Sequence, residues 1–424
     1  MGYHFSRLKN GLKVVTVPMH DRASVAVAVW IRTGSRFEPH RLNGVSHFLE
    51  HMLFKGTKKR TTRQIKEAVE GVGGVLNAFT SEECTCYFAK LLQEHFSVAF
   101  DVLSDMVANA ALSGEEFKRE KTVILEEIKM YRDLPSQHVH DMMGELLWPD
   151  QPLGRPIAGT LESVEKLSRA DLADYKRRYY HPANIVVSVS GPVVHNEVME
   201  HARKVFEPLT GNPVSKFEKA RSRQAKPRFR FQEKQTEQTH FVAGFHGLSR
   251  SDADRYKLGL LNVILGANMS SRLFEEVREK RGLAYEIRSG ASFFEDTGSI
   301  TISAGVETRK APQAMRIILR ELDKLKKKPV SPVELSRAKD YFMSQLTLSL
   351  EDTLDHLLWV CDRMMFGEVL PDKEKIRERI EEVLPKDIQA MARRLFLTEK
   401  LNLTLVGPVD SAMQKKIQNE VKMS

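Results

Sequence analysis

The sequence has few cysteines and lacks long apolar runs. Only three of its 424 residues are cysteine. Cys84 and Cys86 are two apart in an expected strand, so their side chains share a face and are badly placed to bridge each other. A reducing compartment is the simplest expectation. No window approaches the roughly eighteen apolar residues of a membrane-spanning helix. The first residues lack the apolar core of a secretory signal, and we therefore expect a cytoplasmic protein.

Positive charge is in excess, but it is not concentrated in one part of the sequence. The net charge is +9, and hydrophobic and charged residues make up 42% and 29% of the chain, which is typical of globular proteins. The densest basic stretches are "KGTKKRTTR" at 55–63 and "ELDKLKKKP" at 321–329. Both read better as solvated helix ends than as nucleic-acid sites. Neither a nucleic acid nor a membrane is expected as a partner.

The chain repeats itself at an offset of about 216 residues. "DLADYKRRYYHPANIVVSVSGPV", which begins at Asp171, matches "DIQAMARRLFLTEKLNLTLVGPV", which begins at Asp387. Each copy reads as an amphipathic helix, a β-rich run and a Gly-Pro stop. Two copies indicate a duplicated domain and not a solenoid. We predict one domain over 1–210, a polar linker over 211–229 and a homologous domain over 230–424.

Within each copy, alternating strands come first and long helices follow. The clearest helices run from about Glu94 to Ala110 and onward from Ser113, which forms a capping box with Glu116. Separate runs of strands and helices predict an α+β fold. Each domain would have a mainly antiparallel sheet with helices packed on one face.

The stretch "GVSHFLEHMLFKG" places two histidines four residues apart. On a helix, His47 and His51 project from the same face, and two imidazoles at this spacing can reach one zinc ion. Glu50 can then reach a water at the metal and take its proton as the water attacks a carbonyl. The alternative is a pair of surface or packing histidines. Two histidines alone also do not complete a catalytic zinc site, so a third ligand is needed.

Three carboxylates in "EFKREKTVILEEIKMYRD" are candidates for that ligand. Glu120 and Glu127 are two helical turns apart and share a face, whereas Glu126 is rotated away by about 100°. Spacing alone does not choose between Glu120 and Glu127. In the second copy "HFLEH" becomes "VILGA" at 263–267, and the positions that match Glu120 and Glu127 are Ala338 and Gln345. The polar set is lost together while the apolar framework remains, as expected of one functional site.

These motifs resemble the pitrilysin/insulinase-type zinc metallopeptidases, which carry the inverted His-x-x-Glu-His motif. The resemblance covers nearly the whole chain and is strongest to short members, similar to the β subunit of mitochondrial processing peptidase and its bacterial relatives. In that family the third zinc ligand follows the second histidine by about 76 residues, which implies Glu127. Glu120 would be the ligands' outer partner. The resemblance implies one Zn²⁺ per chain, held by the domain 1–210.

Two further motifs match the family. "NAFTSEE" resembles the strand edge that pairs with an extended peptide beside the zinc, which implies Asn77, Ala78 and Phe79 as substrate-binding residues. "REKRGLAYEI" carries Arg278 and Tyr285, which match an Arg/Tyr pair that contacts the substrate and stabilises the developing oxyanion. Without the family, these residues would read as an ordinary turn and strand, a helix end and a strand aromatic.

The resemblance also implies a second chain. In the family a catalytic chamber closes between two bilobed halves, and a chain of this length supplies one of them. Because this chain holds both motifs, we expect a homodimer, with a heterodimer with an inactive homologue as the alternative. Long glycine-rich guiding loops of the processing peptidase's partner are absent from this sequence. This absence argues against presequence processing as the specific role, and the choice between presequence processing and peptide degradation stays open.

The leading prediction is a zinc endopeptidase that cleaves unstructured peptides inside a closed chamber. His47, His51 and Glu127 would bind zinc and Glu50 would act as general base. The rival from another class is a structural or chaperone-like subunit of the same fold. The intact ligand set argues against this rival, because a scaffold has no need of a metal-activated water.

Overall fold

A computed structural model describes residues 2–210, 216–367 and 372–422. The chain forms two compact units, each assembled from separate segments. Unit 1 comprises Met1–Lys129, Arg155–Glu218 and Thr347–Leu370. Unit 2 comprises Met130–Gly154, Lys219–Leu346 and Pro371–Ser424. Each half of the chain contributes a segment to the other half's unit, an exchange that the predicted ranges 1–210 and 230–424 do not include.

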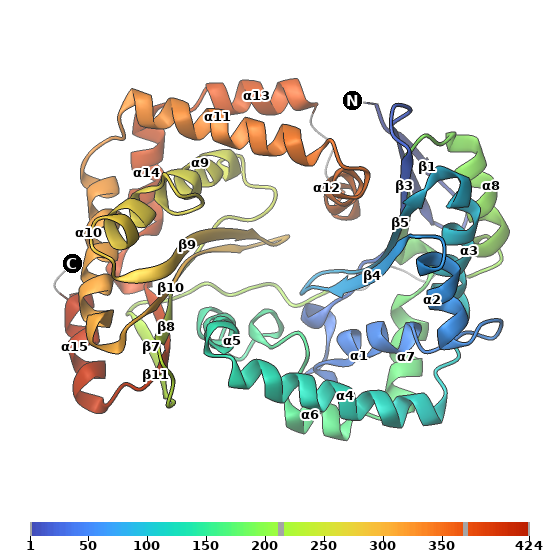
Figure 1. The fold of residues 1–424 in the computed structure, drawn as a ribbon, viewed down its shortest axis with the longest axis horizontal. Coiled ribbons are helices and arrows are strands. Elements are labelled where there is room, and N and C mark those ends of the chain that lie inside the picture. Colours follow the sequence, from blue (N-terminus) through green and yellow to red (C-terminus); the bar gives the residue numbers. More distant parts are fainter. Residues whose placement is uncertain (1, 211–215, 368–371, 423–424) are drawn as a thin grey trace. The chain divides into compact units, whose positions relative to one another are not determined.

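Unit 1 contains a six-stranded sheet (Figure 1). Its strands are β1 (His4–Arg7), β2 (Lys13–Pro18), β3 (Ser24–Ile31), β4 (Val75–Thr80), β5 (Thr85–Leu92) and β6 (Ile185–Gly191). Their order across the sheet is β1-β2-β6-β3-β5-β4, so β4 lies at one edge. Only the β2–β6 pair is parallel.

Unit 2 repeats this topology. Its strands are β7 (Arg228–Glu233), β8 (Thr239–His246), β9 (Ala284–Phe293), β10 (Gly298–Val306) and β11 (Asn402–Gly407). They are ordered β7-β11-β8-β10-β9, and only the β7–β11 pair is parallel. The order and directions match β2-β6-β3-β5-β4 of unit 1. The duplicated, mainly antiparallel α+β domains predicted from the sequence are therefore confirmed.

Strand β3 shows why the sheet of unit 1 needs cover on both faces. Its sequence, SVAVAVWI, is apolar at every position after the first, and every residue after Ser24 is buried. Because side chains alternate between faces, Val27 and Val29 enter one core whereas Ala28 and Trp30 enter another. The second core includes residues of α12 (Thr353–Met365) and all three cysteines, which are not joined in disulfides.

A single exchanged helix provides the second layer in each unit. The main helical layer of unit 1 includes α3 (Phe96–Asn109), and α12 (Thr353–Met365) packs on β3, β6 and β2. In unit 2, α5 (Pro135–Leu147) packs on β8 and β11. The predicted one-face arrangement is therefore completed by a helix from the other half of the sequence. Local periodicity does not reveal this contribution, because it identifies a helix but not its sheet.

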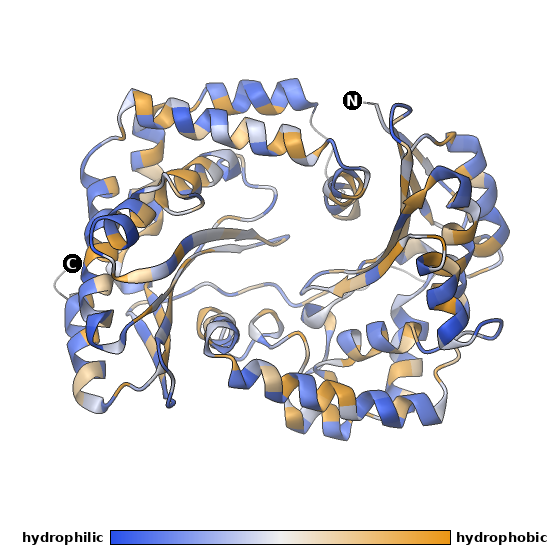
Figure 2. Ribbon diagram, in the orientation of Figure 1, coloured by the Kyte–Doolittle hydropathy of each residue, from blue (hydrophilic) through white to orange (hydrophobic). Residues whose placement is uncertain are grey.

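The remaining helices carry both hydrophobic and hydrophilic residues along their length, as expected of helices that bury one side (Figure 2). They are α1 (Val45–Leu53), α2 (Thr62–Glu70), α4 (Gly114–Asp133), α6 (Leu161–Lys166), α7 (Arg169–Tyr179), α8 (His195–Phe206), α9 (Arg255–Leu265), α10 (Ala311–Lys327), α11 (Pro332–Ser349), α13 (Lys373–Glu381), α14 (Pro385–Leu395) and α15 (Ser411–Lys422). A further irregular helical turn, η6, spans Phe274–Glu279. Within the described ranges, none of the helices combines the length and apolar character needed to span a bilayer.

Several local predictions can be compared with the structure. The helix expected from about Glu94 to Ala110 is α3, preceded by a short turn, and the backbone N–H of Glu116 donates to Ser113 Oγ at the start of α4. Of the predicted linker 211–229, residues 211–215 lie outside the described residues. Residues 216–227 form neither helix nor strand, and β7 begins directly after them.

Candidate metal centre

The helix α1 is held at its first turn by a buried carboxylate. Glu38 Oε1 accepts from the backbone N–H of Ser46 and Oε2 from that of Gly44, each at 2.8 Å. These are N–H groups that a helix leaves without partners of its own. Gly44 has a φ of 94°, and a Cβ there would lie 2.7 Å from the carbonyl oxygen of Ala158. Only glycine fits this left-handed, closely packed position.

One side of α1 is apolar and the other carries the histidines. The buried apolar residues of the helix are Val45, Phe48, Leu49, Met52 and Leu53. Phe48 stacks on Phe117 of α4, with ring centroids 4.9 Å apart and planes 7° from parallel. This contact fixes α4 against α1. It therefore determines which carboxylates of α4 reach His47 and His51.

Of the three candidate carboxylates, Glu127 meets both histidines. Its Oε1 lies 3.8 Å from His47 Nε2 and its Oε2 lies 3.6 Å from His51 Nε2. One ligand atom from each of these three residues lies within 4.8 Å of the others, and no other such group occurs in the described part of the chain. Glu126 instead pairs with Lys129 at the surface, at 2.7 Å. The geometry thus places Glu127 next to both histidines, where spacing alone had left the choice between Glu120 and Glu127 open.

The three side chains suit a zinc ion. Two imidazoles and one carboxylate are a ligand set of catalytic zinc sites, which keep a further position open. Glu127 Oε2 is buried and has no hydrogen-bond partner among the described residues. Burial, assisted by the charge on His51, lowers the pKa of His47 to about 3. His47 is therefore neutral, which is the form that binds metal.

Glu120 contacts two groups with its two carboxylate oxygens, one on His51 and one on Lys55. Its Oε1 lies 2.9 Å from His51 Nδ1 and its Oε2 lies 2.7 Å from Lys55 Nζ. Burial opposes ionisation of Glu120, but the bonds from His51 and Lys55 lower its pKa overall. In the neutral form of His51 that binds metal, Nδ1 donates to Glu120 and the lone pair lies on Nε2, the atom that faces Glu127. The outer-partner position that the resemblance implied for Glu120 matches this geometry.

Lys55 was missed by sequence reasoning. It reads there as part of a basic stretch, yet it lies four residues after His51. That spacing places the two side chains on one side of the chain as α1 ends. It is the feature of the sequence from which the role of Lys55 could have been inferred. The structure assigns Lys55 to the carboxylate that supports the histidine.

Glu50 lies next to the ligands without being one of them. Its Oε2 accepts a hydrogen bond of 2.5 Å from Thr80 Oγ1, at the end of β4. Burial raises the pKa of Glu50, and the Thr80 bond acts in the opposite direction. Thr80 was not singled out from the sequence, although it lies inside the "NAFTSEE" stretch. A carboxylate with a raised pKa beside a metal-ligand set has the properties of a general base.

The predicted substrate strand is an edge strand. Asn77, Ala78 and Phe79 lie on β4, and β5 is the one described strand of unit 1 that pairs with it. The N–H of Ala78 donates to the side-chain oxygen of Asn77 at 2.8 Å. In an antiparallel edge strand, alternate backbone groups face away from the sheet and can receive another strand.

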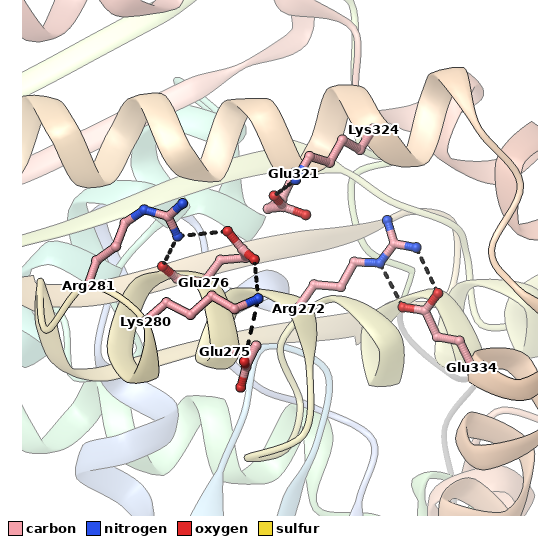
Figure 3. Close-up of polar contacts among 8 residues, drawn as sticks. All are labelled: Arg272, Glu275, Glu276, Lys280, Arg281, Glu321, Lys324 and Glu334. Carbon is pink, nitrogen blue, oxygen red and sulfur yellow. Dashed lines mark hydrogen bonds and ion pairs between the residues drawn. The ribbon is translucent and has the colours of Figure 1, made fainter.

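Arg278 and Tyr285 lie in unit 2 and contact each other. The Arg278 guanidinium carbon is 4.9 Å from the centre of the Tyr285 ring, and Tyr285 as a whole residue is 78% exposed. Arg278 belongs to η6, where Glu276 pairs with Lys280 and Arg281 (Figure 3). The predicted substrate contacts of Arg278 and Tyr285 stay predictions.

Two family models match this chain. Residues 13–161 match the model described as Insulinase (Peptidase family M16), and residues 166–342 match that described as Peptidase M16 inactive domain. The sequence is 39% identical over 408 residues to an uncharacterized zinc protease of Bacillus subtilis, covering 94% of this chain and 97% of the relative. It is 35% identical over 421 residues to one of Streptomyces coelicolor, covering 98% and 91%.

Solved structures share the fold. A protease from Helicobacter pylori matches with a TM-score of 0.90 and 25% identity, covering 96% of this chain and 99% of that one. A structure described as a peptidase M16 inactive domain from Pseudomonas fluorescens matches with a TM-score of 0.89 and 20% identity, covering 97% and 98%. The second likeness, at this identity, concerns the fold alone.

Proposed function

Because the chain belongs to the insulinase (M16) family of peptidases, we propose that it is a zinc-dependent endopeptidase for extended, unstructured peptides. The observation that carries this proposal is the convergence of His47, His51 and Glu127 next to Glu50. When bound there, zinc would supply a Lewis acid that polarises a carbonyl and activates water. Its relatives are named zinc proteases, which is consistent with this assignment.

Glu50 would carry the proton. Its carboxylate takes a proton from the attacking water and then gives it to the leaving amine, so that one group serves both halves of the reaction. Burial raises the pKa of Glu50 from its ordinary value, which makes it a better proton acceptor than an exposed glutamate. His51 is oriented by Glu120, which in turn is held by Lys55.

The edge of β4 would bind the peptide as an added strand. Main-chain hydrogen bonds to Asn77, Ala78 and Phe79 would give affinity with little demand on side-chain identity. This mode suits an extended peptide and excludes a folded one, whose backbone groups are already paired. Arg278 and Tyr285 would contact substrate, and a second copy of this chain would complete the chamber.

A structural or chaperone-like subunit is the second candidate function. The match to a model described as an inactive domain applies to residues 166–342, which exclude His47, Glu50, His51 and Glu127. Residues 13–161, which contain all four, match the other family model. The retained polar set therefore favours the peptidase.

Substitution of Glu50 by Gln tests the proposal. It removes the proton acceptor but keeps size and hydrogen bonding, so we expect kcat to fall roughly 10²- to 10⁴-fold. Hydrolysis of a quenched fluorogenic peptide gives kcat, and elemental analysis gives zinc content, which we expect to be unchanged. A chelator should abolish activity of the unsubstituted protein. Zinc-free protein, or full activity of Glu50→Gln, would contradict the mechanism.

A further inference from the structure

The side chain of Thr80 points from the edge strand to the helix that carries Glu50. Along β4, Leu76 and Ala78 pack against the core that contains α1, whereas Phe79 packs against Trp30 on the opposite face, at 5.6 Å between ring centres. Thr80 shares the face of Leu76 and Ala78 by alternation. Its hydroxyl is thereby placed 2.5 Å from Glu50 Oε2.

The backbone around Thr80 is fixed independently of this bond. Thr80 pairs with Thr85 at the last register position before the β4–β5 turn. The backbone N–H of Ser35 donates to the carbonyl of Ser81 in that turn, and the N–H of Arg36 donates to the carbonyl of Glu82, at 3.2 and 2.9 Å. The Thr80 hydroxyl is therefore held by a rigid hairpin, and Glu50 is the group that it can orient.

Unit 2 provides an internal comparison for this residue. In β9–β10 the last register position before the turn is Phe293–Gly298, so Phe293 occupies the place of Thr80. A backbone hydrogen bond to the turn is also present in unit 2, where the N–H of Arg250 donates to the carbonyl of Phe294 at 2.7 Å. The hairpin support is thus common to both units. The hydroxyl is present only beside the histidines and Glu50.

We propose that Thr80 is a positioning residue of the reaction: its hydroxyl fixes Glu50 Oε2 and thereby leaves Oε1 directed at the attacking water. This inference rests on the proposed function and deepens it. Because β4 is also the strand that would receive the peptide, the same residue joins the peptide-binding edge to the proton acceptor. Binding and proton transfer would then depend on one hairpin register.

Three variants test this role. Thr80→Val removes the hydroxyl but keeps the β-branched shape that a strand favours. Thr80→Ser restores the hydroxyl. Thr85→Val removes a hydroxyl from the facing strand, where the Thr85 side chain donates to the carbonyl of Thr33 at 3.0 Å and also forms a hydrogen bond with Tyr180. It is therefore the matched control for loss of a hydrogen bond in this hairpin.

Steady-state kinetics with a quenched fluorogenic peptide give the first readout. We expect kcat of Thr80→Val to fall about 10- to 100-fold, with KM and zinc content unchanged, as for loss of a hydrogen bond to a charged group. Thr80→Ser and Thr85→Val should stay within about threefold of the unsubstituted protein. A kcat of Thr80→Val equal to that of the unsubstituted protein overturns the proposal. So does a loss that appears in KM or zinc content alone.

Crystal structures of Thr80→Val and Thr80→Ser give a readout that does not depend on activity. We expect the Glu50 carboxylate to leave its place in Thr80→Val and to keep it in Thr80→Ser. A Glu50 carboxylate that stays in place in Thr80→Val overturns the positioning role. If the unsubstituted protein cleaves no peptide, the proposed function fails, and these structures still decide whether Thr80 positions Glu50.

Discussion

The two units are built on one topology, but they differ in their polar residues. Unit 1 has His47, Glu50 and His51 on α1, where the sequence of unit 2 has Val263, Gly266 and Ala267 in and directly after α9. The sheets have the same strand order, with β7 in the place of β2 and β9 in the place of β4. The same topology therefore forms in unit 2 without the polar set, which is specific to unit 1.

The backbone contacts that occur in both units show which residues support the fold. Arg36 and Arg250 each donate a backbone N–H to the turn of an edge hairpin. Glu38 accepts backbone N–H groups at the start of α1, and Asp252 accepts that of Asp254 at the start of α9. Such contacts satisfy backbone groups that every hairpin and helix leaves open. Residues present in unit 1 alone are the better candidates for chemistry.

The largest expected effect comes from removing the third ligand. Glu127→Gln leaves two histidines, which do not complete a zinc site, so we expect zinc content and peptide hydrolysis to be lost together. Its counterpart Gln345→Glu adds a carboxylate to the exposed surface of α11 in unit 2 and should change neither. Elemental analysis measures the zinc content of each variant, and a fluorogenic peptide assay measures its hydrolysis. Full zinc content in Glu127→Gln would contradict the assigned site.

A smaller effect is expected from Lys55→Met. Lys55 holds Glu120, which orients His51, and loss of such outer contacts typically weakens metal binding by 10- to 100-fold. The matched control is Lys324→Met in unit 2, where Lys324 contacts the buried Glu321 at 2.6 Å (Figure 3). Competition with a chelator gives the zinc affinity. Equal losses in the two variants would show that a general effect on stability, and not Glu120, is responsible.

The smallest expected effect concerns Glu38, which accepts backbone N–H groups at the start of α1, as Asp252 does at the start of α9. Burial raises the pKa of Glu38 to about 7, against the bonds from Ser46 and Gly44. An unfolded glutamate ionises near pH 4.3, so the folded protein holds this proton more tightly between that pH and about 7. The stability that it contributes is full below about pH 4 and declines as the pH rises to 7.

Glu38→Gln removes this titration. The free energy of unfolding of metal-free protein, relative to that of the variant, should fall by about 1–3 kcal/mol between pH 5 and pH 7. Urea unfolding at the two pH values measures it. A difference between the two proteins that is constant over this range would show that Glu38 has an ordinary pKa.

Much of the fold was predictable from local patterns. The duplication was visible because both copies conserve an amphipathic helix, a β-rich run and a Gly-Pro stop, and the observed sheets have matching strand orders. The shared face of Glu120 and Glu127 followed from helical periodicity, and both turn toward α1. The exchange of α5 and α12 was not predictable, because an apolar helix face does not specify which sheet it covers.

The sequence by itself determined the identity and spacing of the histidines, the loss of the polar set in the second copy and the alternating pattern of the strands. These features involve residues that are close together in the chain. The periods of the helix and the strand then decide which of their side chains lie on the same face. The tertiary structure decided what those faces meet. The stacking of Phe48 on Phe117 brings Glu127 to the histidines, and the packing of β4 against α1 brings Thr80 to Glu50. Both depend on packing between segments far apart in the chain, and no local spacing encodes such packing.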